Sequence, residues 1–191
     1  MGVSTVQQLI NRAKNMNGYN NSGIATDAVW VDFFNAALVE MTDDLNLEET
    51  FTINFAPGTR EYALPSDFYA LSVIYDQNGS PVTMRRNYNQ RYPVGYWILS
   101  KGDRYVIDLY EYSQPLTFTL LYRRYPKPLT YSEIATQKPE VPTAGEIALC
   151  YKAIYFACLN NNQIGQAEFF DSLFQKERVN IKTAASRARG V

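Results

Sequence analysis

Hydrophobic positions recur with a helical period at both ends of the chain. This spacing predicts helices over residues 4–16 and after Asp27, and again over residues 146–159 and 164–185. In the helix after Asp27 the apolar residues form one stripe, with the acidic residues between them on the side facing water. We expect each helix to bury its stripe against another helix. The stripe of the second helix comprises Trp30, Phe33, Phe34, Ala37, Leu38, Met41 and Leu45.

Polar residues at the expected helix starts predict how the first two helices are capped. Ser4 and Gln7 have the spacing of a capping box, in which each side chain accepts a hydrogen bond from the backbone of the other residue. Asp27 precedes the second apolar stripe and is expected to cap that helix through its carboxylate.

The period of the pattern changes to two at Thr50. Apolar and polar residues alternate over residues 51–55, which predicts a strand with one buried face. Asn78-Gly79 is a hairpin signal between two further strands. About six or seven short strands fit into residues 50–125, a spacing typical of a small antiparallel sandwich or barrel.

Prolines are concentrated after this β region. Residues 126–145 hold four of the nine prolines and are expected to form an extended linker. The chain therefore divides into N-terminal helices (1–49), the β region (50–125), the linker, and C-terminal helices with a basic tail (146–191). Both helical ends have apolar stripes to bury. We predict an α+β fold in which they pack together as one helical bundle, with the antiparallel β region inserted between them.

The composition excludes several kinds of site. The chain has no histidine, so a Ser-His-Asp triad, a Cys-His pair and a histidine-ligated zinc site are impossible. Cys150 and Cys158 are too few for a four-cysteine zinc site, and about 12 Å of helix separates them, too far for a disulfide. No phosphate-binding loop motif is present. We expect no enzymatic activity, no metal and no cofactor.

The sequence has no pattern of membrane insertion or export. The most apolar stretch, residues 147–159, is interrupted by Lys152 and is too short to cross a bilayer. The N-terminus lacks the basic region and long apolar core of a signal peptide. We expect a protein made in the cytosol, with no membrane contact.

Charge is distributed unevenly along the chain. Seven acidic residues and no basic residue lie between Asp27 and Glu49, whereas five basic residues and one acidic residue follow from Lys176 onward. This asymmetry predicts a complementary contact or a tail that binds an acidic partner, and a solvated, frayed terminus is the alternative. From Val179 onward large apolar residues are few, so we expect this segment to become ordered only on a partner. The candidate contact residues of the tail are Arg178, Lys182, Arg187 and Arg189.

A second candidate surface combines basic and aromatic residues between positions 85 and 104. Tyr, Trp and Arg are enriched at the energetic centres of protein interfaces, and the same combination is found in single-strand nucleic-acid and sugar sites. The sequence pI of about 5.5 lies below the basic range of dedicated nucleic-acid binders. We therefore rank a protein interface first, core and loop packing second and nucleic acid third. The candidate residues are Arg85, Arg86, Tyr92 and Trp97.

Three segments, in this order, resemble a known family. They are the acidic helix WVDFFNAALVEM, the β segment GTREYALPSDFYALSVIYDQNGSPV and the helix entry KPEVPTAGEIALCYKAIYFACL. The β segment contains a Leu-Pro-x-Asp-Phe box at residues 64–68. Together they resemble the head-to-tail adaptor (connector) proteins of tailed bacteriophages, of the podophage tail-adaptor type. The box itself is explained by structure, since Pro65 keeps Leu64 extended and Asp67 can accept a backbone hydrogen bond in the turn.

The resemblance implies a structural role in the neck of the virion. Such adaptors form a ring of like subunits, usually twelve, beneath the portal protein. The ring extends the channel through which genomic DNA passes, without sequence specificity, and it offers a platform to downstream tail, nozzle or tail-tube proteins. Their C-terminal segment often reaches the portal, so the resemblance implies that the basic tail meets the portal or the DNA.

Two other functions remain open from the residues alone. The β region is compatible with a ligand-binding or carbohydrate-binding sandwich carried on a helical bundle. The acidic residues are compatible with a carboxylate-dependent cell-wall hydrolase carried in the virion, although no pair of them stands out.

Overall fold

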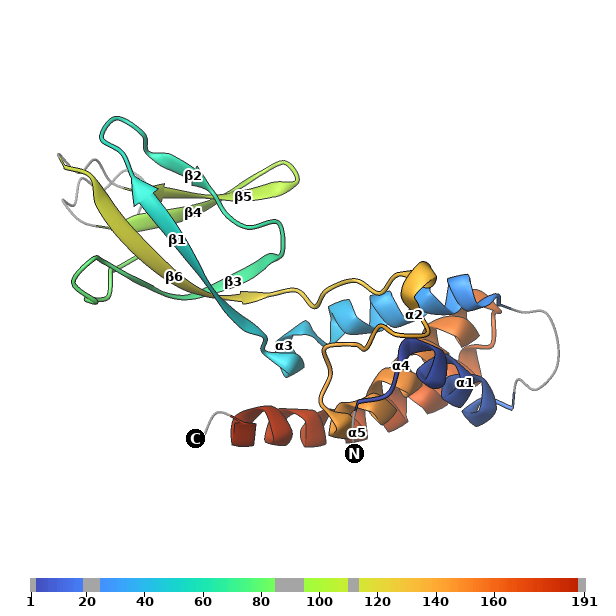
Figure 1. Ribbon diagram of the computed structural model, residues 1–191. Helices are drawn as coiled ribbons and strands as arrows, with labels where there is room; N and C mark the ends of the chain where they lie inside the picture. The colour runs from blue at the N-terminus through green and yellow to red at the C-terminus, as the bar shows by residue number, and fades with distance from the viewer. Residues whose placement is uncertain (1–2, 19–24, 85–94, 110–113, 189–191) are drawn as a thin grey trace. The chain divides into compact units, whose positions relative to one another are not determined.

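The chain folds into two compact units. A computed structural model describes residues 3–18, 25–84, 95–109 and 114–188, and the side chains of 184–188 are not described (Figure 1). The helical unit comprises residues 1–46 and 126–191, and the β module comprises residues 47–125. Helices come from both ends of the chain, and the β module contains two antiparallel three-stranded sheets. This arrangement confirms the predicted α+β fold.

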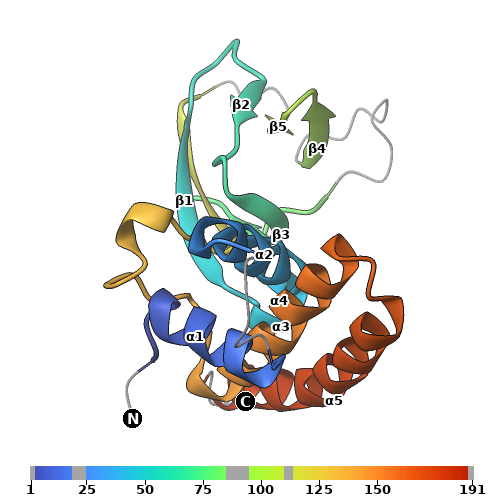
Figure 2. The same ribbon diagram turned by 90° about the vertical axis from the view of Figure 1, so that its right-hand side faces the viewer.

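The helical unit is organised around one central helix. This helix, α4, packs against α1, α2 and α5, and the two views agree that it lies between α2 and α5 (Figures 1 and 2). Apolar side chains from all of these helices are fully buried, including Phe34 and Phe174. The elements are α1 (Val6–Met16), α2 (Asp27–Glu40), α3 (Thr42–Leu45), η1 (Tyr131–Glu133), η2 (Thr143–Gly145), α4 (Glu146–Asn160) and α5 (Ile164–Ala188).

Both helix caps lie one residue away from the predicted positions. The capping box of α1 uses Thr5 and Gln8, in which the Thr5 hydroxyl accepts from the Gln8 N–H at 3.4 Å and the Gln8 side chain accepts from the Thr5 N–H at 2.9 Å. The Ser4 hydroxyl has other partners: it donates to the Glu146 carboxylate at 2.8 Å and accepts from Arg12 Nη2 at 3.3 Å. Likewise Thr26 caps α2, and Asp27 is the first helical residue. The predicted caps at Ser4 and Asp27 are therefore wrong.

The proline-rich segment 126–145 is part of the helical unit. It is largely irregular, with two short 3-10 turns, and it buries the side chains of Leu129 and Val141. Asn35 on α2 binds the backbone of Leu129 through both its amide oxygen and its amide nitrogen, at 2.7 and 3.0 Å. The segment expected to be a linker thus packs against the helical unit.

Glycine is required where this segment meets α5. A Cβ atom at Gly145 would lie 2.6 Å from Cγ1 of Val141 and 3.4 Å from Cγ1 of Ile181. We predict that Gly145→Ala lowers the stability of the helical unit by about 1–3 kcal/mol, because a methyl group overpacks this contact. The matched control is Gly165→Ala in α5, where an added Cβ meets nothing within 4 Å. This control should stabilise the protein by up to about 1 kcal/mol through helix propensity. Urea unfolding followed by circular dichroism measures the stability of both variants. Equal stability changes would contradict the close packing around Gly145.

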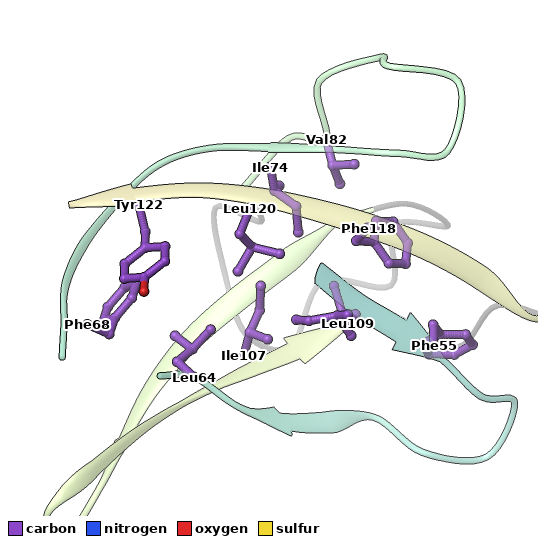
Figure 3. Close-up of a cluster of buried hydrophobic side chains, with 11 residues drawn as sticks. Phe55, Leu64, Phe68, Ile74, Val82, Ile107, Leu109, Phe118, Leu120 and Tyr122 are labelled. Atoms are coloured by element: carbon purple, nitrogen blue, oxygen red, sulfur yellow. The ribbon is translucent and has the colours of Figure 1, made fainter. Parts of the chain in front are cut away.

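The β module has its core between its two sheets. The strands are β1 (Glu48–Phe55), β2 (Glu61–Ala63), β3 (Phe68–Tyr75), β4 (Tyr96–Lys101), β5 (Arg104–Leu109) and β6 (Leu116–Arg124). The first sheet has the order β1-β6-β3 and the second has the order β2-β5-β4, with every pair antiparallel. Alternate residues of both sheets point inward to one apolar cluster (Figure 3). It comprises Ile53, Phe55, Leu64, Phe68, Ile74, Val82, Ile107, Leu109, Phe118, Leu120 and Tyr122.

The Leu-Pro-x-Asp-Phe box connects the two sheets. Its turn closes through a hydrogen bond from the Phe68 N–H to the Pro65 carbonyl at 3.0 Å. The carboxylate of Asp67 accepts the hydroxyl of Tyr122 at 3.1 Å, a side-chain partner in place of the expected backbone donor. Burial and the neighbouring carboxylate raise the pKa of Tyr122 to about 12. The Phe68 ring stacks on Tyr122 with centroids 5.8 Å apart, so the box serves core packing.

Candidate functional site

The basic end of α5 is bound to a buried carboxylate of its own chain. Asp44 on α3 has a fully buried side chain, and Arg178 Nε donates to its Oδ2 at 2.6 Å. Arg178 Nη2 donates to the other oxygen at 3.2 Å, and Lys182 Nζ lies 3.3 Å from that same oxygen. The hydrogen bond to Asp44 raises the pKa of Arg178 above its usual value. We call Asp44, Arg178 and Lys182 the α5 clamp.

The α5 clamp changes the interpretation of the acidic segment. Asp44 was expected on the water-facing side of its helix, and that expectation is wrong. The periodicity breaks at Met41, where α2 ends and the four-residue α3 begins. Burying an isolated carboxylate is costly, and two cations from α5 compensate the charge of this one. The charge asymmetry of the sequence therefore produces a contact within the chain.

A second ionic cluster joins α2, α4 and α5. Lys152 on α4 is buried, and its Nζ lies 2.7 Å from Glu40 Oε1 and 2.9 Å from Asp171 Oδ1. The same ammonium lies 4.0 Å from the ring centroid of Tyr155 and 5.0 Å from that of Phe174. Sequence periodicity had identified Lys152 only as an interruption of an apolar stretch. In the structure it fixes α4 between its two neighbours.

A third cluster holds the N-terminal segment against α4. Glu146, the first residue of α4, is 3% exposed and accepts the Ser4 N–H at 2.7 Å and the Ser4 hydroxyl at 2.8 Å. Arg12 Nη1 lies 3.0 Å from the same carboxylate. Burial alone would raise the pKa of Glu146, but the hydrogen bonds from Ser4 and Arg12 and the Arg12 charge outweigh it and lower that pKa below its usual value.

This lowered pKa predicts an acid-sensitive contact. Because the ionised form of Glu146 is favoured in the folded protein, its contribution to stability is fully present above the unfolded pKa, about 4.3 for glutamate. It is lost as the pH falls through the lower folded pKa. We expect Glu146→Gln to be less stable than the wild type at pH 7 and the difference to shrink below about pH 4. Urea unfolding at several pH values measures this, and a pH-independent difference would contradict it.

The comparison with protein families identifies the chain. The family model described as SU10 adaptor protein matches residues 4–191, which covers both the helical unit and the β module. The chain belongs to the SU10 adaptor protein family. This confirms the resemblance to phage head-to-tail adaptors and supports a structural adaptor role in a phage particle. No curated protein matches the sequence significantly.

In this SU10 adaptor family member, the predicted tail residues divide into two groups. Arg178 and Lys182 are brought together by Asp44. Their side chains are 29% and 62% exposed, so most of the Lys182 side chain remains accessible to solvent. Arg187 lies on the last turns of α5, where the side chains are not described. Arg189 lies outside the described residues.

The end of α5 does not follow the expectation of partner-dependent order. The helix continues from Ile164 to Ala188 and includes the segment after Val179 that was expected to become ordered only on a partner. Ile181 is fully buried and meets Gly145, and Lys182 joins the α5 clamp. These two tertiary contacts supply the stabilisation that the apolar content of the segment alone did not suggest. The expectation is therefore wrong for residues 179–188.

The second predicted surface of this SU10 adaptor lies in the β module, and only part of it is described. Trp97 is half-buried on β4, opposite Asp108 of β5. Its neighbours Tyr96 and Ile98 pack against the core, so Trp97 lies on the outer face of its sheet. Arg60 pairs with Asp108 on this face at 3.0 Å. Arg85, Arg86 and Tyr92 lie outside the described residues.

A groove of about 640 Å³ opens at one end of the β module. It lies between the Leu64–Phe68 turn and the β4–β5 turn, and Tyr105 and Tyr125 line it. Polar groups come from Ser66, Lys101, Asp103 and Arg104. Sequence reasoning missed this groove because its walls come from three separate segments.

Among the described residues, no group of three or more His, Cys, Asp or Glu side chains is arranged to hold a metal ion. None of the helices in that part of the chain combines the length and apolar character needed to cross a bilayer.

Proposed function

We propose that this protein is the subunit of a head-to-tail connector that forms a ring beneath the phage portal. The ring extends the DNA channel and provides a platform on which tail components attach. The observation that carries this proposal is the match of an adaptor family model to residues 4–191, which spans both the helical unit and the β module. The protein acts in the virion neck as a structural component without catalysis, in about twelve copies as is usual for such rings.

The portal-facing element in this proposal is the C-terminal end of α5. Among the described side chains of α5, that of Ile181 is the last buried one, and the helix continues to Ala188. Arg187 and Arg189 then provide the positive charge that meets an acidic portal groove or the DNA in the channel. Lys182, 62% exposed, contributes to this surface, while Arg178 holds the helix against Asp44. Backbone phosphates need no sequence-specific contact, which suits a channel protein.

The tail-facing surface in this proposal is the outer face of β4 and the segment before it. Trp97 with Arg85, Arg86 and Tyr92 would meet tail components or a neighbouring subunit. Support comes from the position of Trp97 on the outer face, half-buried beside the Arg60–Asp108 ion pair. A large aromatic side chain beside an arginine has the composition of a protein-interface centre.

Electron microscopy of the protein mixed with the portal protein of the same phage tests the proposed function. The expected image shows portal rings with an added layer on the tail-facing side. Portal rings that remain bare at saturating protein concentration would contradict the proposal.

The groove of the β module supports a second candidate function, a ligand-binding module. The half-exposed Tyr105 ring and the nearby Asp103 and Arg104 provide an aromatic platform with hydrogen-bonding groups. Binding of host surface glycans that is lost in Tyr105→Ala would favour this alternative.

A further inference from the structure

The outward face of α2 is acidic and only lightly apolar. Asp32, Ala36 and Val39 follow one another at helical spacing and are exposed, with Val39 56% exposed. The opposite face of α2 carries the buried residues that pack on α4. No ion-pair partner of Asp32 is found among the residues that the structure describes. We call Asp32, Ala36 and Val39 the α2 stripe.

The outward face of α5 carries one basic residue among larger exposed apolar side chains, together with the exposed Glu168. Phe169, Lys176 and Val179 lie on it, and the two apolar side chains are 56% and 65% exposed. The inward face of α5 carries Phe170, Phe174 and Ile181, which are buried in the helical unit. Within the described part of the chain, Lys176 has no ion-pair partner. We call Phe169, Lys176 and Val179 the α5 stripe.

The two stripes lie on opposite sides of the helical unit. Helix α4 packs against both α2 and α5 and lies between them in both views (Figures 1 and 2). Each stripe faces away from the side that packs on α4, so the two stripes of one subunit cannot meet each other. Two different complementary faces on opposite sides of a subunit are what a head-to-tail contact requires, and such contacts form a ring when the rotation between neighbouring subunits closes.

We propose that the α5 stripe of one subunit binds the α2 stripe of the next subunit in the ring. This inference rests on the proposed function and names the faces through which like subunits meet. Lys176 pairs with Asp32 across the contact between antiparallel helices. The exposed surfaces of Phe169 and Val179 are buried on either side of this pair, with Phe169 beside Val39. The small side chain of Ala36 lets the two helices approach to the usual 8–10 Å between their axes. The acidic and basic residues at the two faces also orient the subunits before contact.

Charge reversal at the two stripes tests the inference with the full-length chain. Asp32→Lys and Lys176→Glu each place like charges across every contact of the ring. We expect each variant to reduce the number of portal rings that carry an adaptor layer by at least about tenfold. The chain carrying both changes restores opposite charges and should assemble again. An equimolar mixture of the two single variants should also assemble, because alternating subunits match at each contact.

The controls separate this contact from the fold and from the proposed function. Lys138→Glu reverses an exposed charge in the 126–145 segment, outside both stripes, and should assemble like the wild type. Circular dichroism melting of every variant should match that of the wild type, because both target residues are exposed. Normal assembly of each single variant would overturn the inference while the proposed function stands. Failure of the mixture and of the double variant to assemble on portal rings would also overturn the inference. A wild-type protein that leaves portal rings bare would contradict the proposed function and this contact together.

Discussion

Replacing Arg178 by methionine should lower the free energy of unfolding of the helical unit by about 3 kcal/mol. The side chain of Asp44 is fully buried, and Arg178 makes two of its contacts, at 2.6 and 3.2 Å. Without the guanidinium, a buried carboxylate keeps only Lys182 at 3.3 Å. An incompletely compensated buried charge is among the costliest single defects in a folded protein. Urea unfolding followed by circular dichroism at 222 nm measures this loss.

The clamp prediction has a matched control and a rescue. Lys176→Met removes an exposed basic side chain from the same helix and should change stability by less than about 0.5 kcal/mol. Changing Arg178 to Met together with Asp44 to Leu should recover most of the lost stability, because apolar residues often replace a buried ion pair without penalty. Similar losses for Arg178→Met and Lys176→Met would show that Asp44 is not held as described.

Ending the chain at Lys182 should strongly weaken docking on the portal while leaving the helical unit folded. The structure sets the position of this truncation, since Ile181 is fully buried and Lys182 completes the α5 clamp. A deletion that began at residue 180 would remove both and would confuse lost binding with lost folding. We expect portal affinity to fall at least about tenfold, since several charge contacts are removed at once. Co-sedimentation with portal rings measures the affinity, and a melting curve verifies the fold.

Salt separates the two partners that the basic end of α5 could meet. The variant Arg187→Gln with Arg189→Gln keeps the chain length and removes only the charge. If these residues contact DNA, the affinity of the wild type for DNA falls steeply with salt, and the slope decreases in the variant. If they contact the portal, the variant binds portal rings without DNA more weakly than the wild type does. Unchanged docking of the truncated chain would remove this segment from the mechanism.

Local pattern was sufficient to predict the longer helices and most strands, although the strand expected after Asn78-Gly79 is present only as isolated bridges of Pro81 and Met84. Each of the four longer helices and the change to strands near Thr50 follows from periodicity, because apolar spacing reports which face of an element is buried. The caps were less predictable. Ser4 and Thr5 are equivalent as capping residues, and the choice between them depends on Glu146, which is 142 positions from Ser4 in sequence. A local sequence pattern cannot predict partners that are so distant in the sequence.

The same limit applies to the candidate site. The sequence predicted that Arg178 and Lys182 contact an acidic partner. It also showed an acidic segment that contains Asp44. It could not show that these groups meet, because the pairing requires α3 to pack on α5. Lys152 was likewise missed, since only the folded chain shows Glu40 and Asp171 on either side of its ammonium. A lone basic residue in an apolar helical stripe was the available signal.

The most direct test of the account is the mass of the portal after the protein has been added. Mass photometry of portal rings with an excess of the 21.8 kDa chain should show one heavier species, without a series of masses between it and the bare ring. The account predicts an increment equal to the mass of a full ring of copies, about twelve. A portal mass that does not change, or that grows by scattered single copies without reaching a closed ring, would contradict the assignment of this protein as a head-to-tail connector.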